Sequence, residues 1–118
     1  MRMSKDIPAL QAALRAFAQE RDWEQFHAPK NLAAALSVEA AELLEHFQWL
    51  TEEQSRNLST EGRARVAEEM ADVLLYMLQL ADKLGIDPID AAWKKLEVNK
   101  EKYPVERAKG RSTKYTDL

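Results

Sequence analysis

Two pairs of acidic residues have the types and the spacing that metal-dependent chemistry requires. Glu39 and Glu42 form an E-x-x-E pair, and Glu69 and Asp72 form an E-x-x-D pair. Because residues three apart share one face of a helix, each pair presents two carboxylates on the same side. Both pairs lie beside apolar stripes, where a carboxylate is rarely buried without a partner. The sequence offers no matching pair of buried cations, so a bound metal ion is the simplest partner.

The chemistry of the ligands narrows the choice of metal. Oxygen ligands alone suit Mg²⁺ or Mn²⁺, whereas Zn²⁺ usually recruits histidine or cysteine. A di-iron carboxylate bundle would need Glu-x-x-His on two helices. That pattern is missing, because Leu43 stands three residues before His46, and His27 lies outside the expected helices. A lone E-x-x-E pair is usually solvated, and this interpretation remains open for either pair taken alone.

Other residues are weaker candidates for substrate contacts. Trp23, Phe26 and His27 occupy an aperiodic stretch, where they could stack on a base or plug the core. Tyr76, one helical turn after the second acidic pair, could point its hydroxyl at the site or simply pack. Asn99 could contact a ligand or lie at the surface. The basic residues of the C-terminal segment could close on phosphates or form a solvated tail: Arg107, Lys109, Arg111 and Lys114.

Helical periodicity predicts the elements that carry the first acidic pair. Ser4 or Asp6 can cap a first helix, which should end near Arg21. A second helix should begin at Pro29, a favoured first position, and run to about Gln48. The first acidic pair therefore belongs to the second helix.

Two further helices follow. A capping-box pattern over residues 51–54 predicts a short helical turn. Thr60 can cap a third helix that carries the second acidic pair and ends at Gly85. A fourth helix starts after Asp87, and Pro104 stops it.

Composition bounds the class of protein. The 118 residues fit one domain, and 17 basic against 20 acidic residues give a net charge of −3. A duplex nucleic-acid binder would usually be basic, so we expect no nucleic-acid partner. The absence of cysteine excludes disulfides and thiolate metal sites. No apolar run reaches the length of a membrane span and no signal peptide is evident, so we expect a cytoplasmic protein without a membrane partner.

These features predict an all-α fold. We expect a four-helix bundle assembled as an oligomer, with a helical domain at 1–104 and a basic C-terminal tail at 105–118. The third helix is apolar on more than one side and has few neighbours within the chain, which favours an oligomer.

The chain also resembles a known family, the MazG-like, all-α nucleoside triphosphate pyrophosphohydrolases. The resemblance is closest to the dCTP pyrophosphatase group and covers nearly the whole chain. It rests on E-x-x-E, a spacer and E-x-x-D, and on the stretches RDWEQFHAPKNL, ELLEHFQWL, EEMADVLLYM and KYTDL. One position departs from the pattern: the histidine expected nine residues before Trp23 is Leu14 here.

The resemblance implies an activity and a set of site residues. The family hydrolyses a nucleoside triphosphate between its α and β phosphates, with Mg²⁺ as the cofactor. The oxygen ligands would also accept Mn²⁺ as a substitute. The implied catalytic and metal-binding residues are Glu39, Glu42, Glu69 and Asp72. The implied substrate-binding residues are Trp23, Trp49, Tyr76, Lys95, Asn99, Lys109, Arg111 and Lys114.

We therefore expect residues 1–104 to form a MazG-like catalytic domain that converts a dNTP, dCTP or a modified dCTP, to the monophosphate and pyrophosphate. The family also assembles as dimers or tetramers, which implies a homo-oligomer here. Two alternatives remain open. One is a related activity on dUTP or mixed NTPs, and the other is a non-catalytic helical interaction protein whose acidic faces meet basic partners.

Overall fold

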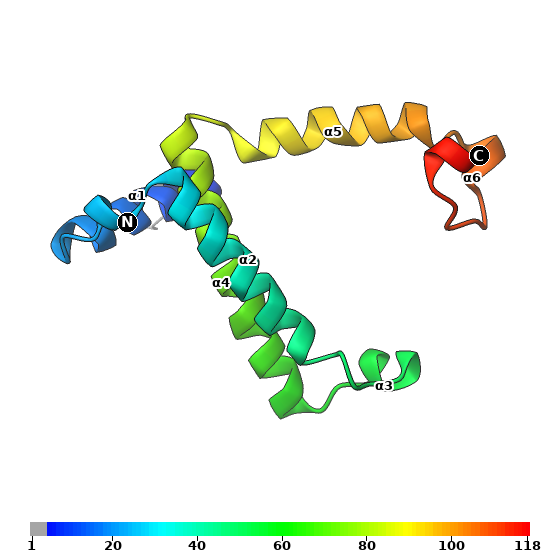
Figure 1. The fold of residues 1–118 in the computed structure, drawn as a ribbon, viewed down its shortest axis with the longest axis horizontal. Coiled ribbons are helices and arrows are strands. Elements are labelled where there is room, and N and C mark those ends of the chain that lie inside the picture. The colour runs from blue at the N-terminus through cyan, green and yellow to red at the C-terminus, as the bar shows by residue number, and fades with distance from the viewer. Residues whose placement is uncertain (1–4) are drawn as a thin grey trace. The chain divides into compact units, whose positions relative to one another are not determined.

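A computed structural model of the chain describes residues 5–118, and Figure 1 shows its helices. Every regular element in this range is an α-helix or a short 3₁₀ turn, which confirms the all-α prediction. The chain divides into two compact units, one ending at Gly85 and the other running from Ile86 to Leu118. None of the helices in the described range combines the length and apolar character needed to cross a membrane.

The first helix, α1 (Ile7–Glu20), begins where its capping residue predicts. The Asp6 carboxylate accepts a hydrogen bond from the backbone N–H of Ala9 at 2.9 Å. Ser4, the alternative cap, lies outside the described residues. Two polar contacts then attach α1 to α4 (Thr60–Leu84): Gln11 Nε2 donates to the Leu78 carbonyl at 3.0 Å, and Arg15 pairs with Asp82 at 2.7 Å.

A 3₁₀ turn, η1 (Glu24–Phe26), leads into α2 (Pro29–Glu45), which begins at Pro29 as predicted. The predicted end at Gln48 is wrong by three residues. The helix stops earlier because the chain tightens into i→i+3 hydrogen bonds, from the N–H of His46 to Leu43 O and from that of Phe47 to Leu44 O.

The short helix α3 (Glu52–Arg56) confirms the predicted capping box. Gln54 N–H donates to Thr51 Oγ1 at 3.1 Å, and Thr51 N–H donates to Gln54 Oε1 at 2.9 Å.

The long helix α4 is capped by Ser59 and not by Thr60, so that part of the prediction is wrong. Ser59 Oγ accepts from the Gly62 N–H at 3.0 Å, which makes Thr60 the first helical residue. Both neighbours carry a suitable hydroxyl, and sequence preference alone does not choose between them. At the other end Gly85 adopts φ 65°, the left-handed conformation that the prediction of a terminal glycine requires.

Two long helices make the main packing of the first unit. Figure 1 shows α2 and α4 side by side and running in opposite directions, and α1 contacts α4 as well. The buried side chains among the described residues are Ala18, Leu32, Leu78 and Ala81. The core of this unit therefore lies where α4 meets α1 and α2, and it is small.

The second unit contains α5 (Pro88–Lys102), α6 (Val105–Ala108) and the 3₁₀ turn η2 (Tyr115–Asp117). The Asp87 carboxylate caps α5 as predicted. The Tyr103 and Tyr115 rings meet edge to face with centroids 6.0 Å apart, and Lys102 Nζ lies 4.6 Å from the Tyr115 ring. The C-terminal segment, which shows no periodicity in sequence, therefore has local structure against the end of α5.

Candidate metal centre

The packing of α2 on α4 positions two of the predicted carboxylates. On each helix a stripe of residues recurs at alternating spacings of three and four, the pattern of a helix–helix seam. The α2 stripe is Leu32, Leu36, Glu39 and Leu43, and the α4 stripe is Val66, Glu69, Val73 and Tyr76. All of these side chains are buried or half-buried. One glutamate from each helix thus occupies a position that the pattern otherwise gives to apolar residues.

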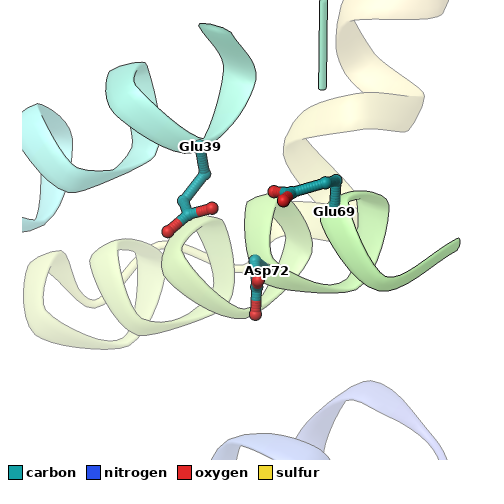
Figure 2. A group of neighbouring side chains, drawn as sticks. All are labelled: Glu39, Glu69 and Asp72. Carbon is teal, nitrogen blue, oxygen red and sulfur yellow. The ribbon is translucent and has the colours of Figure 1, made fainter. Parts of the chain in front are cut away.

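One carboxylate of α2 and two of α4 lie close together, and the Asp72 side chain among them is exposed. Figure 2 shows Glu39 reaching from α2 toward Glu69 on α4, with Asp72 on the next turn of α4. One oxygen of each carboxylate lies within 4.8 Å of the others. The Oε2 atoms of Glu39 and Glu69 are buried and have no hydrogen-bond partner. Within residues 5–118 no lysine, arginine or histidine forms an ion pair with these three groups.

Glu42, the fourth predicted ligand, is half-buried on α2 and lies outside this group of three. Glu42 nevertheless affects the neighbouring Glu39, whose pKa is raised to about 7. The largest cause is a hydrogen bond that the protonated Glu39 carboxyl can share with Glu42. Burial, a similar bond with Glu69, and the charges of Glu42 and Asp72 add to the effect.

The donor set fits a hard divalent cation. Carboxylate oxygens are the ligands that Mg²⁺ and Mn²⁺ prefer, and the group contains no nitrogen or sulfur donor. Buried carboxylate oxygens without partners are costly, and a cation would supply the missing counter-charge. We therefore refer to Glu39, Glu69 and Asp72 as the carboxylate cluster.

A hollow of about 220 Å³ is lined in part by Asp72, which also belongs to the carboxylate cluster. Two predicted substrate-binding residues, Trp23 and Tyr76, line it. Trp23 is 44% exposed and packs edge to face on Phe17, with ring centroids 5.6 Å apart. The other lining residues are Leu14, Phe17, His27, Leu75 and Gln79. The structure thus joins an aromatic surface, on which a flat ring could stack, to a group of carboxylates.

The remaining predicted substrate residues are Trp49 and five residues of the second unit. Trp49 follows α2, is 86% exposed and does not line the hollow. The others belong to the second unit, where Asn99 is half-buried and the basic residues are exposed: Lys95, Asn99, Lys109, Arg111 and Lys114. Their contacts with substrate stay predictions.

Gln79 is a lining residue that sequence reasoning did not single out. It follows Asp72 by seven residues and Tyr76 by three, so all three share one face of α4. That spacing is the signal by which it could have been found.

Comparisons with known proteins show which family the chain resembles. The MazG-like family matches residues 34–118. The protein named dCTP pyrophosphatase 1 from Bos taurus is 43% identical over 97% of this chain and 67% of its own length. The Mus musculus protein of the same name is 44% identical over 97% of this chain and 66% of its own length. The chain thus spans about two thirds of these relatives.

A comparison with solved structures also finds a similar protein. The crystal structure of a pyrophosphatase from Archaeoglobus fulgidus is 41% identical, with a TM-score of 0.80, over 88% of this chain and 97% of its own. At this identity the likeness extends beyond general helical architecture. Taken with the acidic motifs on α2 and α4, these matches establish that the chain belongs to the MazG-like family.

Proposed function

We propose that this protein is a metal-dependent nucleotide pyrophosphohydrolase that converts dCTP or a modified dCTP to the monophosphate and pyrophosphate. The observation that carries the proposal is the junction of the carboxylate cluster with the aromatic hollow through Asp72. A nucleotide has the same two parts, a polyphosphate that needs cations and a flat base that needs a stacking surface. The names of the relatives supply the choice of dCTP.

Glu39, Glu69 and Asp72 would hold Mg²⁺, or Mn²⁺ in its place, and Glu42 lies beside them. The ion would supply charge neutralisation for the triphosphate oxygens. Trp23 and Tyr76 orient the nucleotide by holding its base in the hollow. Glu42 is outside the cluster, which leaves its carboxylate to accept the proton of the attacking water.

A panel of common dNTPs and NTPs with Mg²⁺ tests this proposal. We expect equal amounts of monophosphate and pyrophosphate from dCTP, and turnover at least ~10²-fold lower in Glu39→Gln because the metal centre carries most of the reaction. Glu68→Gln is the matched control, since Glu68 is an exposed neighbour on α4. If the protein prefers dUTP or mixed NTPs, the assignment of dCTP as the substrate is wrong and those nucleotides take its place. No pyrophosphate from any nucleotide would refute the enzyme assignment and favour an interaction protein.

We also propose that the protein works as a homo-oligomer, a dimer or a tetramer. Met70, Leu74 and Met77 form an exposed apolar stripe on α4, at the spacing of a helix–helix seam. A second copy would offer the same stripe, so the contact can be self-complementary. Sedimentation equilibrium should give a dimer or tetramer for the wild type and for Arg63→Glu, an exposed polar control on α4. Leu74→Glu should dissociate it, and a monomeric wild type at micromolar concentration would contradict the proposal.

A further inference from the structure

The wall of the hollow contains one side-chain amide, that of Gln79. We propose that Gln79 selects the base, because its amide oxygen can accept a hydrogen bond from an exocyclic amine. This would favour an aminopyrimidine such as cytosine over uracil or thymine. The inference rests on the proposed function and deepens it by assigning a specificity residue.

The position of Gln79 along α4 suits this role. Asp72, Tyr76 and Gln79 lie in this order along one face of the helix. Seven residues of α-helix span about 10 Å, so the Cα atoms of Asp72 and Gln79 are about this far apart along the helix. An extended nucleotide separates its α-phosphate from the far edge of its base by a comparable distance. With the phosphates at the carboxylate cluster and the base near Tyr76, that edge would reach Gln79.

A hydrogen bond fixes which way the amide points. Gln79 Nε2 donates to the Leu75 carbonyl at 3.1 Å, a part-buried contact within α4. A carbonyl cannot donate, so this contact must be made by the NH₂ group and not by the amide oxygen. Within residues 5–118 no donor bonds to Gln79 Oε1. The oxygen is therefore left as an acceptor, held in place by the other half of the same amide.

A hydrogen-bond acceptor at Gln79 Oε1 would distinguish pyrimidines that carry an exocyclic amine from those that carry an exocyclic oxygen. The exocyclic group of cytosine is an amine that donates, whereas the equivalent group of uracil is an oxygen that accepts. Uracil would set two acceptors against each other and leave both unpaired, which costs more than the absence of a bond. Stacking on Trp23 and Tyr76 cannot make this distinction, because every base presents an aromatic face. His27 also lines the hollow, but an imidazole can donate or accept a hydrogen bond, so it does not favour one pyrimidine over the other.

The experiment compares dCTP with dUTP in three variants. Gln79→Leu removes the acceptor at nearly constant volume, and Gln79→Glu keeps an acceptor oxygen. Gln11→Leu is the control, because the Gln11 amide also donates to a backbone carbonyl, that of Leu78 at 3.0 Å between α1 and α4, but does not line the hollow. For each protein we would measure kcat/KM for both triphosphates, and the binding of dCMP and dUMP in EDTA by calorimetry.

We expect Gln79→Leu to lower the dCTP to dUTP ratio of kcat/KM about three- to tenfold, the worth of one hydrogen bond, and to lower the dCMP to dUMP binding ratio alike. Gln79→Glu keeps an acceptor but loses the NH₂ contact with Leu75 that holds it, so it should retain only part of the preference for cytosine. Gln11→Leu should keep both ratios at wild-type values. If Gln79→Leu leaves both ratios unchanged while the wild type hydrolyses dCTP, the inference fails and the proposed function stands. If the wild type hydrolyses no nucleotide, both fail together.

Discussion

Replacing Glu39 by glutamine should stabilise the metal-free protein at neutral and alkaline pH. The folded state raises the pKa of this carboxyl to about 7, from an ordinary value of 4.5. A group with a raised folded pKa binds more protons in the folded than in the unfolded state. Its contribution to stability is therefore fully present below pH 4.5 and is lost as the pH rises toward 7. Glutamine keeps the shape of the protonated acid and cannot lose that proton.

The pKa of Glu39 also sets the size of the pH effect on metal binding. At pH 7 about half of the folded molecules carry the proton, whereas well below a tenth of unfolded chains do. Because a metal ligand must be deprotonated, this group alone should weaken the apparent Mg²⁺ affinity about tenfold at pH 6 relative to pH 8 and above. Mg²⁺ at ~100 times its Kd should add about 2.7 kcal/mol to the stability of the wild type.

Thermal melting of the wild type, Glu39→Gln and Glu68→Gln checks these expectations, with EDTA and with Mg²⁺ at pH 5 and pH 8. In EDTA, Glu39→Gln should melt above the wild type at pH 8, and the gap should narrow at pH 5. Mg²⁺ should raise the melting temperature of the wild type and of Glu68→Gln at pH 8, with little gain for Glu39→Gln. A lower melting temperature for Glu39→Gln in EDTA at pH 8, with equal Mg²⁺ shifts in all three proteins, would refute the reasoning.

Three further predictions concern the same unit. Asp72→Asn should weaken Mg²⁺ binding and lower turnover at least ~10²-fold, which metal titration by calorimetry and steady-state kinetics would measure. Trp23→Ala should weaken nucleotide binding by roughly 1–3 kcal/mol, seen as a raised KM with little loss of melting temperature. A large melting loss at constant KM would make Trp23 a core residue instead. Leu78→Ala should lower the free energy of unfolding by about 2–5 kcal/mol, because this side chain is 2% exposed. Leu84→Ala, at a position 52% exposed, is its control for urea unfolding and should lose far less.

Local sequence signals predicted the helices well because capping and periodicity act over a few residues. Asp6, Pro29 and Gly85 each stand where the structure begins or ends a helix. Errors occur where two neighbours offer the same chemistry, as with Ser59, or where a helix tightens before it stops, as near His46. Such choices depend on tertiary packing, which a local pattern does not contain.

The sequence likewise predicted one part of the candidate site and not the rest. The E-x-x-E and E-x-x-D spacing predicted a shared face on each helix, and the structure brings Glu39, Glu69 and Asp72 together. That Glu42 lies outside this group depends on the register between α2 and α4, which sequence spacing does not specify. The hollow at Trp23 is formed by α1, the segment before α2, and α4. Its full lining could not be read from any single segment, although the spacing on α4 places Gln79 on the same face as Asp72 and Tyr76.

The seam between α2 and α4 also supports the proposal that the carboxylates serve a function other than helix packing. If this seam served only to pack two helices, leucine or valine at positions 39 and 69 would continue the stripes of apolar residues beside them. Placing two acids there leaves buried oxygens without partners, and the pKa of Glu39 is raised to about 7 by Glu42 beside it, by burial and by Glu69. Such an arrangement weakens the metal-free fold, and buried ionic groups can often be replaced by apolar ones with a gain in stability. A less stable seam of this kind is what the proposed metal centre predicts, because a cation would be the partner of these oxygens.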